Sequence, residues 1–84
     1  MDKKPVGKVT HFFNKISVAV VDLTDELRNG DRISIEGPAG VVEQVVSSMQ
    51  INKEPVARAG AGQSIGLKVD ARVREGDTVY VLTE

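Results

Sequence analysis

The sequence contains no cysteine and no tryptophan, and aromatic residues make up only 4% of its 84 positions. Without cysteine the chain has no disulfide and no zinc site held by thiolates, so a small core must stabilise the fold alone. A long apolar run is also missing, because the longest uninterrupted stretch, Val18 to Val21, is far too short to span a bilayer. No apolar segment of signal-peptide length follows the charged first residues. We therefore expect a soluble cytoplasmic protein with no membrane partner.

The chain has no excess of either charge. Eleven lysines and arginines face twelve aspartates and glutamates, which leaves a formal net charge of −1. A general nucleic-acid coat needs surplus cations to displace counterions from phosphates, so the composition argues against that class. The distribution is uneven, however, because Lys3, Lys4, Lys8 and Lys15 fall within the first fifteen residues, opposed only by Asp2. These lysines indicate either a local basic patch or an ordinary solvated surface.

Residue types that support catalysis or ligand binding are scarce. His11 is the single histidine, and no serine lies in a nucleophile-elbow context. The sequence has neither a calcium-loop pattern nor a His-x-x-x-His spacing. The glycine-rich stretch Ala57 to Leu67 lacks the Lys-Ser or Lys-Thr of a Walker loop, and the residues after it alternate like a strand instead of opening a helix. We therefore predict a non-enzymatic protein without metal, nucleotide or other cofactor.

Apolar residues recur with a period of two along most of the chain. Ile16, Val18 and Val20 share one phase, Ile33 and Ile35 form another pair, and similar runs continue to residue 81. This alternation is typical of strands with one buried and one solvated face. Compact turn signals separate the runs, which gives six or seven strands.

The number and spacing of these strands predict an all-β fold, a small closed antiparallel β-barrel of six to seven strands. Closure is favoured because it removes exposed strand edges that would template aggregation. No composition break divides the chain, so residues 5–84 are expected to form one domain, and a monomer, after a flexible tail at residues 1–4.

One sequence pattern occurs twice. "LRNGDRISI" (Leu27 to Ile35) and "VREGDTVYV" (Val73 to Val81) share apolar–Arg–x–Gly–Asp–x–apolar–x–apolar. Each copy predicts a turn with glycine at a positive φ and with aspartate capping the backbone of the next strand. We therefore expect the same corner to be used twice.

Several motifs resemble the second domain of elongation factor Tu and its archaeal and eukaryal counterparts. "SMQINKEPVARAGAGQSIGLKV" (Ser48 to Val69) resembles a strand and loop of that domain, and Gly7-Lys8-Val9 looks like its opening Gly-Arg-Val. "LRNGDRISIEG" and "VREGDTVYVL" resemble two further strands of it. The likeness covers Val6 to Leu82 and implies a translation-factor barrel without activity of its own. The GTPase domain of those factors is missing, so no nucleotide switch is implied.

A second likeness is to the small C-terminal barrel of collagenase-like peptidase-family proteins, several of which are associated with RNA hydroxylation. Those barrels open with a run similar to "GKVTHFFNKISVAVVDL" (Gly7 to Leu23) and carry "SMQI" (Ser48 to Ile51). The chain also resembles stand-alone archaeal proteins of this size that are described as translation-factor-like. In elongation factors the domain helps to hold the aminoacylated end of tRNA, and in related factors it contacts the ribosome. The family's glutamate at this site corresponds to Gln50, which can stack and hydrogen-bond but carries no charge.

Two functions are consistent with these features. The first is a binding module that contacts RNA, either a tRNA end or the ribosome, or an RNA-modifying or translation protein. The alternative is an accessory barrel that docks onto a larger enzyme without touching RNA. Adjacent phenylalanines on a strand point to opposite faces, so one ring is expected in the core and the other either on a stacking platform or capping a barrel end. The candidate binding residues are Lys8, His11, Phe12, Lys15, Gln50, Asn52, Lys53 and Arg58.

Overall fold

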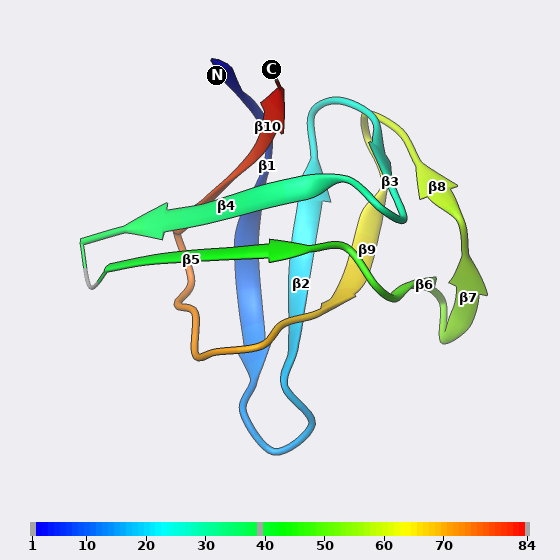
Figure 1. The fold of residues 1–84 in the computed structure, drawn as a ribbon. Helices are drawn as coiled ribbons and strands as arrows, with labels where there is room; N and C mark the ends of the chain where they lie inside the picture. Colours follow the sequence, from blue (N-terminus) through cyan, green and yellow to red (C-terminus); the bar gives the residue numbers. More distant parts are fainter. Residues whose placement is uncertain (1, 39, 84) are drawn as a thin grey trace.

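A computed structural model describes residues 2–38 and 40–83 of the chain and contains ten β-strands (Figure 1). The strands are β1 Asp2–Phe13, β2 Val18–Leu23, β3 Leu27–Arg28, β4 Arg32–Gly37, β5 Gly40–Val45, β6 Met49–Ile51, β7 Glu54–Val56, β8 Arg58–Ala59, β9 Ser64–Lys68 and β10 Thr78–Thr83. The prediction of an all-β fold is therefore confirmed. In the part of the chain that is described, no helix is long and apolar enough to cross a membrane.

Eight of the strands form one antiparallel sheet in the order β5-β4-β10-β1-β2-β9-β6-β7, and β3 pairs with β8 in a second, two-stranded sheet. The large sheet curls so that the β4–β5 hairpin crosses in front of β1 and β2 (Figure 1). Within residues 2–38 and 40–83, no strand ladder joins β5 to β7, so the fully closed barrel predicted from the sequence is not observed. The strand count is also higher than six or seven, because strands of two or three residues are too short to show alternation.

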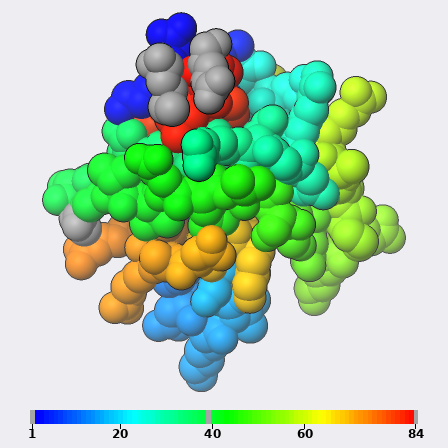
Figure 2. Space-filling model, viewed as in Figure 1, coloured from blue at the N-terminus to red at the C-terminus, as the bar shows by residue number. Residues whose placement is uncertain are grey.

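The side chain of Gln44 connects β5 to the segment that follows β9. The Gln44 amide donates from Nε2 to the carbonyl of Lys68 at 2.8 Å, and its Oε1 accepts from the amide of Asp70 at 2.8 Å. Gln44 is only 7% exposed. Figure 2 shows β5 in green directly beside the orange segment that follows β9. One amide group therefore joins two segments that are remote in sequence, in the manner of a strand-to-strand pair.

A flexible tail was expected at residues 1–4; Met1 lies outside the described residues, and residues 2–4 belong to β1 instead. Asp2, Lys3 and Lys4 pair with residues 83, 82 and 81 of β10. Lys3 also forms an ion pair with Glu36 at 2.7 Å, and Lys4 forms one with Asp25 at 2.6 Å. The sequence offered no apolar alternation here, and these backbone and charge contacts order the segment without it.

These two ion pairs predict a loss of stability in acid. Lys3 and Ser34 hold the pKa of Glu36 below its ordinary 4.5, and Lys4 holds that of Asp25 below 3.8. Because both pKa values are depressed on folding, the stabilisation is complete above the unfolded values and is lost as the pH falls through the folded ones. Urea unfolding at about pH 6 and about pH 3 should show a smaller decline for a Glu36→Gln, Asp25→Asn variant than for the wild type. An equal decline in both proteins would contradict the assignment.

The repeated Arg-x-Gly-Asp pattern forms the same corner twice, as predicted. The amide of Arg28 donates to Asp31 Oδ2 at 3.0 Å, and the amide of Arg74 donates to Asp77 Oδ2 at 3.0 Å. Each aspartate therefore caps the first residue of its own turn, and not the next strand as expected. The spacing of three residues lets a short carboxylate reach back to that amide.

The two corners also share the same backbone conformation and the same backbone hydrogen bonds. Gly30 and Gly76 both have φ at 92°, a conformation that favours glycine. The Gly30 amide donates to the carbonyl of Val46 at 2.8 Å, and the Gly76 amide donates to that of Val9 at 2.8 Å. Val46 and Val9 each donate in return to the aspartate carbonyl of the same corner at 2.8 Å. Each corner thus fixes one buried valine and begins one of two paired strands, β4 and β10.

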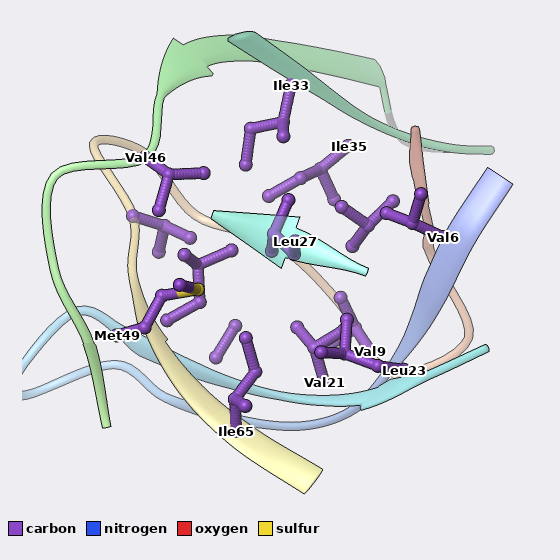
Figure 3. Packing of buried hydrophobic residues seen from close by; sticks show 14 of the residues in the cluster. Val6, Val9, Val21, Leu23, Leu27, Ile33, Ile35, Val46, Met49 and Ile65 are labelled. Carbon is purple, nitrogen blue, oxygen red and sulfur yellow. The ribbon is translucent and has the colours of Figure 1, made fainter. Parts of the chain in front are cut away.

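The core is a single apolar cluster inside the curled sheet (Figure 3). Leu27 of the short strand β3 is fully buried and points into this cluster (Figure 3). The large sheet supplies most of the other residues, because alternate side chains of its strands face inward. The largest of these buried side chains are Ile33, Ile35, Met49, Ile65 and Leu67.

Candidate functional site

The outward face of β1, β2, β9 and β6 carries an apolar hollow of about 640 Å³. Its apolar lining comes from Phe13, Ile16, Val18 and Val20 on the β1–β2 hairpin and from Ile65 on β9. Phe13 is 47% exposed and Ile16 is 58% exposed. A sheet face that only meets water normally carries polar side chains, so this concentration of apolar groups makes the hollow the candidate site. The full lining is Phe13, Ile16, Val18, Val20, Gln50, Asn52, Lys53, Ser64, Ile65, Gly66 and Lys68.

The strand β9, which lies between β2 and β6, carries a glycine at the hollow. Gly66 of β9 is paired with Val20 on one side and with Gln50 on the other. A Cβ atom at this position would lie 3.3 Å from Val18 Cγ1. Any side chain here would therefore occupy the space between the neighbouring strands, and glycine keeps the hollow open.

A strained two-residue turn forms part of the rim. Asn52 and Lys53 connect β6 to β7 with φ values of 51° and 67°, which are unusual for residues other than glycine. Two residues with positive φ match the geometry of a tight hairpin, and asparagine tolerates it best. Strained backbone of this kind persists where the surrounding structure holds it. The turn places an exposed amide and an exposed ammonium group beside the apolar lining.

The opposite part of the rim contains a second lysine. Lys68 is paired with Val18 in the sheet, and its Nζ donates to the carbonyl of Ile16 at 3.1 Å. This hydrogen bond ties the β1–β2 hairpin to β9. Asp and Glu do not occur among the lining residues, although Asp22 accepts from the Ser64 hydroxyl at one end. The charge of the hollow is therefore positive, from Lys53 and Lys68.

His11 lies next to this hollow without lining it. Its ring meets that of Phe13 edge-on, with 4.4 Å between centroids. On its other side, Nδ1 lies 3.4 Å from Glu75 Oε2, and both side chains are exposed. The aromatic contact positions the Phe13 ring beside the hollow.

The structure brings together only part of the set of binding residues expected from the sequence. Gln50, Asn52 and Lys53 line the hollow, and His11 adjoins it. The other predicted residues are elsewhere: Phe12, Lys15, Lys8 and Arg58.

Phe12 is not the exposed ring of the phenylalanine pair. It is half-buried and packs against the core, whereas Phe13 is the exposed neighbour. Phe12 and Lys15 line a separate shallow depression with Arg72. Lys8 is exposed on β1, and Arg58 is exposed on β8 opposite Arg28. The predicted platform of one ring surrounded by these cations is therefore not assembled as a single site.

The sequence analysis missed Phe13, Ile16, Val18, Val20 and Lys68 as surface residues. Ile16, Val18 and Val20 alternate as a buried face would, but the buried side chains of β2 are Ala19, Val21 and Leu23. Both phases of "ISVAVVDL" are apolar, and a strand that is apolar on both faces in a small antiparallel domain is itself a signal of a contact surface.

Comparisons with known proteins relate the chain to parts of larger proteins. No family model matches it. It is 47% identical over 83 residues to an uncharacterised protease of Methanocaldococcus jannaschii, a match that covers 98% of this chain and 20% of the protease. A collagenase of Porphyromonas gingivalis is 36% identical over 80 residues, which cover 93% of this chain and 22% of the collagenase. The chain thus spans about a fifth of the length of these curated relatives.

A solved structure has the same fold. The C-terminal domain of a U32 peptidase from Geobacillus thermoleovorans has a TM-score of 0.87 to this chain, with 93% of this chain and 91% of that domain covered at 18% identity. The resemblance to collagenase-like proteins is therefore supported in sequence and in fold, whereas the comparisons do not support an elongation-factor identity. The chain is similar in sequence to one segment of protease-named proteins, and it shares its fold with the C-terminal domain of a U32 peptidase.

Proposed function

We propose that this domain is a non-catalytic accessory module that docks, through the hollow on β1, β2, β9 and β6, onto a larger protein of the type to which its relatives belong. The observation that carries the proposal is the apolar outward face, where Phe13 and Ile16 are about half exposed. Apolar groups at the centre of a surface, surrounded by polar ones, are the usual composition of a protein interface.

The size of the relatives supports an accessory role. The match covers nearly all of this chain but only about a fifth of each curated relative. In those proteins the rest of the chain is several times longer than the corresponding segment. A surface on that segment could therefore pack against the rest of the protein. Docking in trans, or within a longer chain, requires the same apolar face.

A non-catalytic role is part of this proposal. His11, the single histidine, is exposed and is engaged with Glu75 and Phe13. The chain has no cysteine to act as a nucleophile. Direct contact with tRNA or ribosomal RNA has less support, because the cations predicted for it lie in separate places around the fold.

Docking predicts a specific effect of Phe13→Ser. The partner to use is the Methanocaldococcus jannaschii relative without the segment that matches this chain, after its cooperative thermal unfolding has been verified. Isothermal titration calorimetry should give a measurable dissociation constant with the wild-type domain, and Phe13→Ser should raise it at least about tenfold because a central aromatic anchor is lost.

Val41→Ser is the matched control for this experiment. Val41 is 59% exposed, more than Phe13, but it lies on β5 outside the hollow. Its removal should leave the dissociation constant unchanged. Equal effects of the two substitutions, or binding of total tRNA at low salt in place of the protein, would refute docking through this face.

A further inference from the structure

The hollow combines an apolar floor with charges of one sign at its rim. Lys53 and Lys68 contribute the charged groups of the lining, and the lining contains no carboxylate. Elsewhere on the surface, Lys3, Lys4 and Arg28 are paired with nearby carboxylates. Within residues 2–38 and 40–83, neither Lys53 nor Lys68 has such a partner, and the same holds for six cations outside the lining: Lys8, Lys15, Arg32, Arg58, Arg72 and Arg74. The two rim lysines are therefore available to a partner.

We propose that the hollow binds a short apolar segment of a partner protein that is flanked by acidic residues. This inference rests on the proposed docking function and specifies the chemistry of the docked segment. Apolar side chains of the segment fill the space over Gly66, which lies beside Val18 and Val20. The carboxylates of the segment meet Lys53 and Lys68.

The two ends of the hollow favour such a segment in different ways. The hydrogen bond from Lys68 Nζ to the carbonyl of Ile16 orders the Lys68 side chain. The ammonium group has further N–H donors for a carboxylate of the segment. Lys53 lies in the strained β6–β7 turn with its φ at 67°, and this short turn fixes its backbone beside the lining. Preorganised charges lose less entropy on binding than free ones, and they discriminate against basic segments by repulsion.

The probe for this inference is a fluorescein-labelled peptide with leucine, isoleucine and phenylalanine at its centre and two aspartates or glutamates at each end. A second peptide has lysines in place of the acidic residues. Fluorescence anisotropy with the wild-type domain should give a dissociation constant of about 10–100 μM for the acidic peptide and at least about tenfold weaker binding for the basic one. Affinity for the acidic peptide should fall as salt is raised, because exposed charge pairs are screened.

Charge-removing variants locate the site. Lys53→Gln with Lys68→Gln should weaken binding of the acidic peptide about tenfold, since each exposed pair contributes modestly. Lys8→Gln with Arg58→Gln removes the same amount of charge outside the lining and should leave the affinity within about twofold. Thermal unfolding of both variants checks that the fold is retained.

The outcomes separate this inference from the proposed function. If neither peptide binds, or both bind equally, while the relative's remainder still binds and Phe13→Ser still weakens that binding, the acidic chemistry is refuted and docking stands. If the remainder also fails to bind, both are refuted. Preferential binding of a single-stranded oligonucleotide at the hollow, or self-association of the domain blocked by Phe13→Ser, would likewise overturn the acidic-segment assignment.

Discussion

Replacement of Gln44 by leucine is expected to lower the free energy of unfolding by about 2–3 kcal/mol, although leucine is similar in size and more apolar. The reason is that Gln44 satisfies two backbone groups at once, the carbonyl of Lys68 and the amide of Asp70, both at 2.8 Å. Leucine has no amide group, so the Lys68 carbonyl and the Asp70 amide lose this partner at a nearly buried position. Urea denaturation followed by far-UV circular dichroism measures the change.

Gln63→Leu is the matched control for this prediction. Gln63 Oε1 also accepts a backbone amide, that of Gly60 at 2.7 Å, but the bond is exposed and spans only three residues. Its loss should therefore cost less than about 1 kcal/mol, because water replaces the lost partner. If the two leucine variants are equally destabilised, the bridge from Gln44 does not hold β5 to the segment after β9.

Gly37→Ala is expected to destabilise the fold by about 2–3 kcal/mol through a clash with one side chain. A Cβ at position 37 would overlap the carboxylate of Asp77, which is nearly buried and accepts from the Arg74 amide. Asp77 would have to leave the corner that begins β10, and the cap of that turn would be lost. The free energy of unfolding from urea titration reports the effect.

A double-mutant cycle tests this mechanism directly. In an Asp77→Ala background the clash is absent, so Gly37→Ala should cost less than about 1 kcal/mol more. Asp77→Ala alone should itself be destabilising, because the cap of the corner is removed. Additive effects of the two substitutions would show that Gly37 is required for some other reason.

The corners were the part of the fold that the sequence predicted best. Gly30 and Gly76 are required by a local rule, a positive φ, and the aspartates that follow them cap amides only three residues away. Such features depend on neighbours in sequence, so the repeated pattern identified them correctly. The direction of the cap was wrong, since a carboxylate after the glycine reaches the start of its own turn more easily than the strand that follows.

Long-range features were predicted poorly for a physical reason. The bridge from Gln44 to residues 68 and 70 joins segments more than twenty positions apart, and the absence of a β5–β7 ladder depends on how the whole sheet curls. A buried glutamine that replaces a strand pair has no distinctive local pattern. The expected tail failed in the same way, because Lys3 and Lys4 are ordered by partners on β4 and after β2.

The exposed apolar residues of the hollow were not identified from the sequence because β2 is apolar on both faces. Alternation identifies a strand, but it does not say which of two apolar faces is inside. The phase of Val18 and Val20 was assigned to the core, whereas the pairing with β9 and the burial of Ala19 and Val21 put the other phase there. The same ambiguity exchanged the roles of Phe12 and Phe13 on the neighbouring strand.

The central claim, that the hollow is a protein-docking surface, is tested most directly by chemical-shift mapping. The ¹⁵N-labelled domain is titrated with the Methanocaldococcus jannaschii relative that lacks the matched segment. We expect the affected amides to cluster at residues 13–20, 50–53 and 64–68, with the β4–β5 hairpin unaffected. Perturbations centred on β4 and β5, or none at about 100 μM partner, would contradict the account.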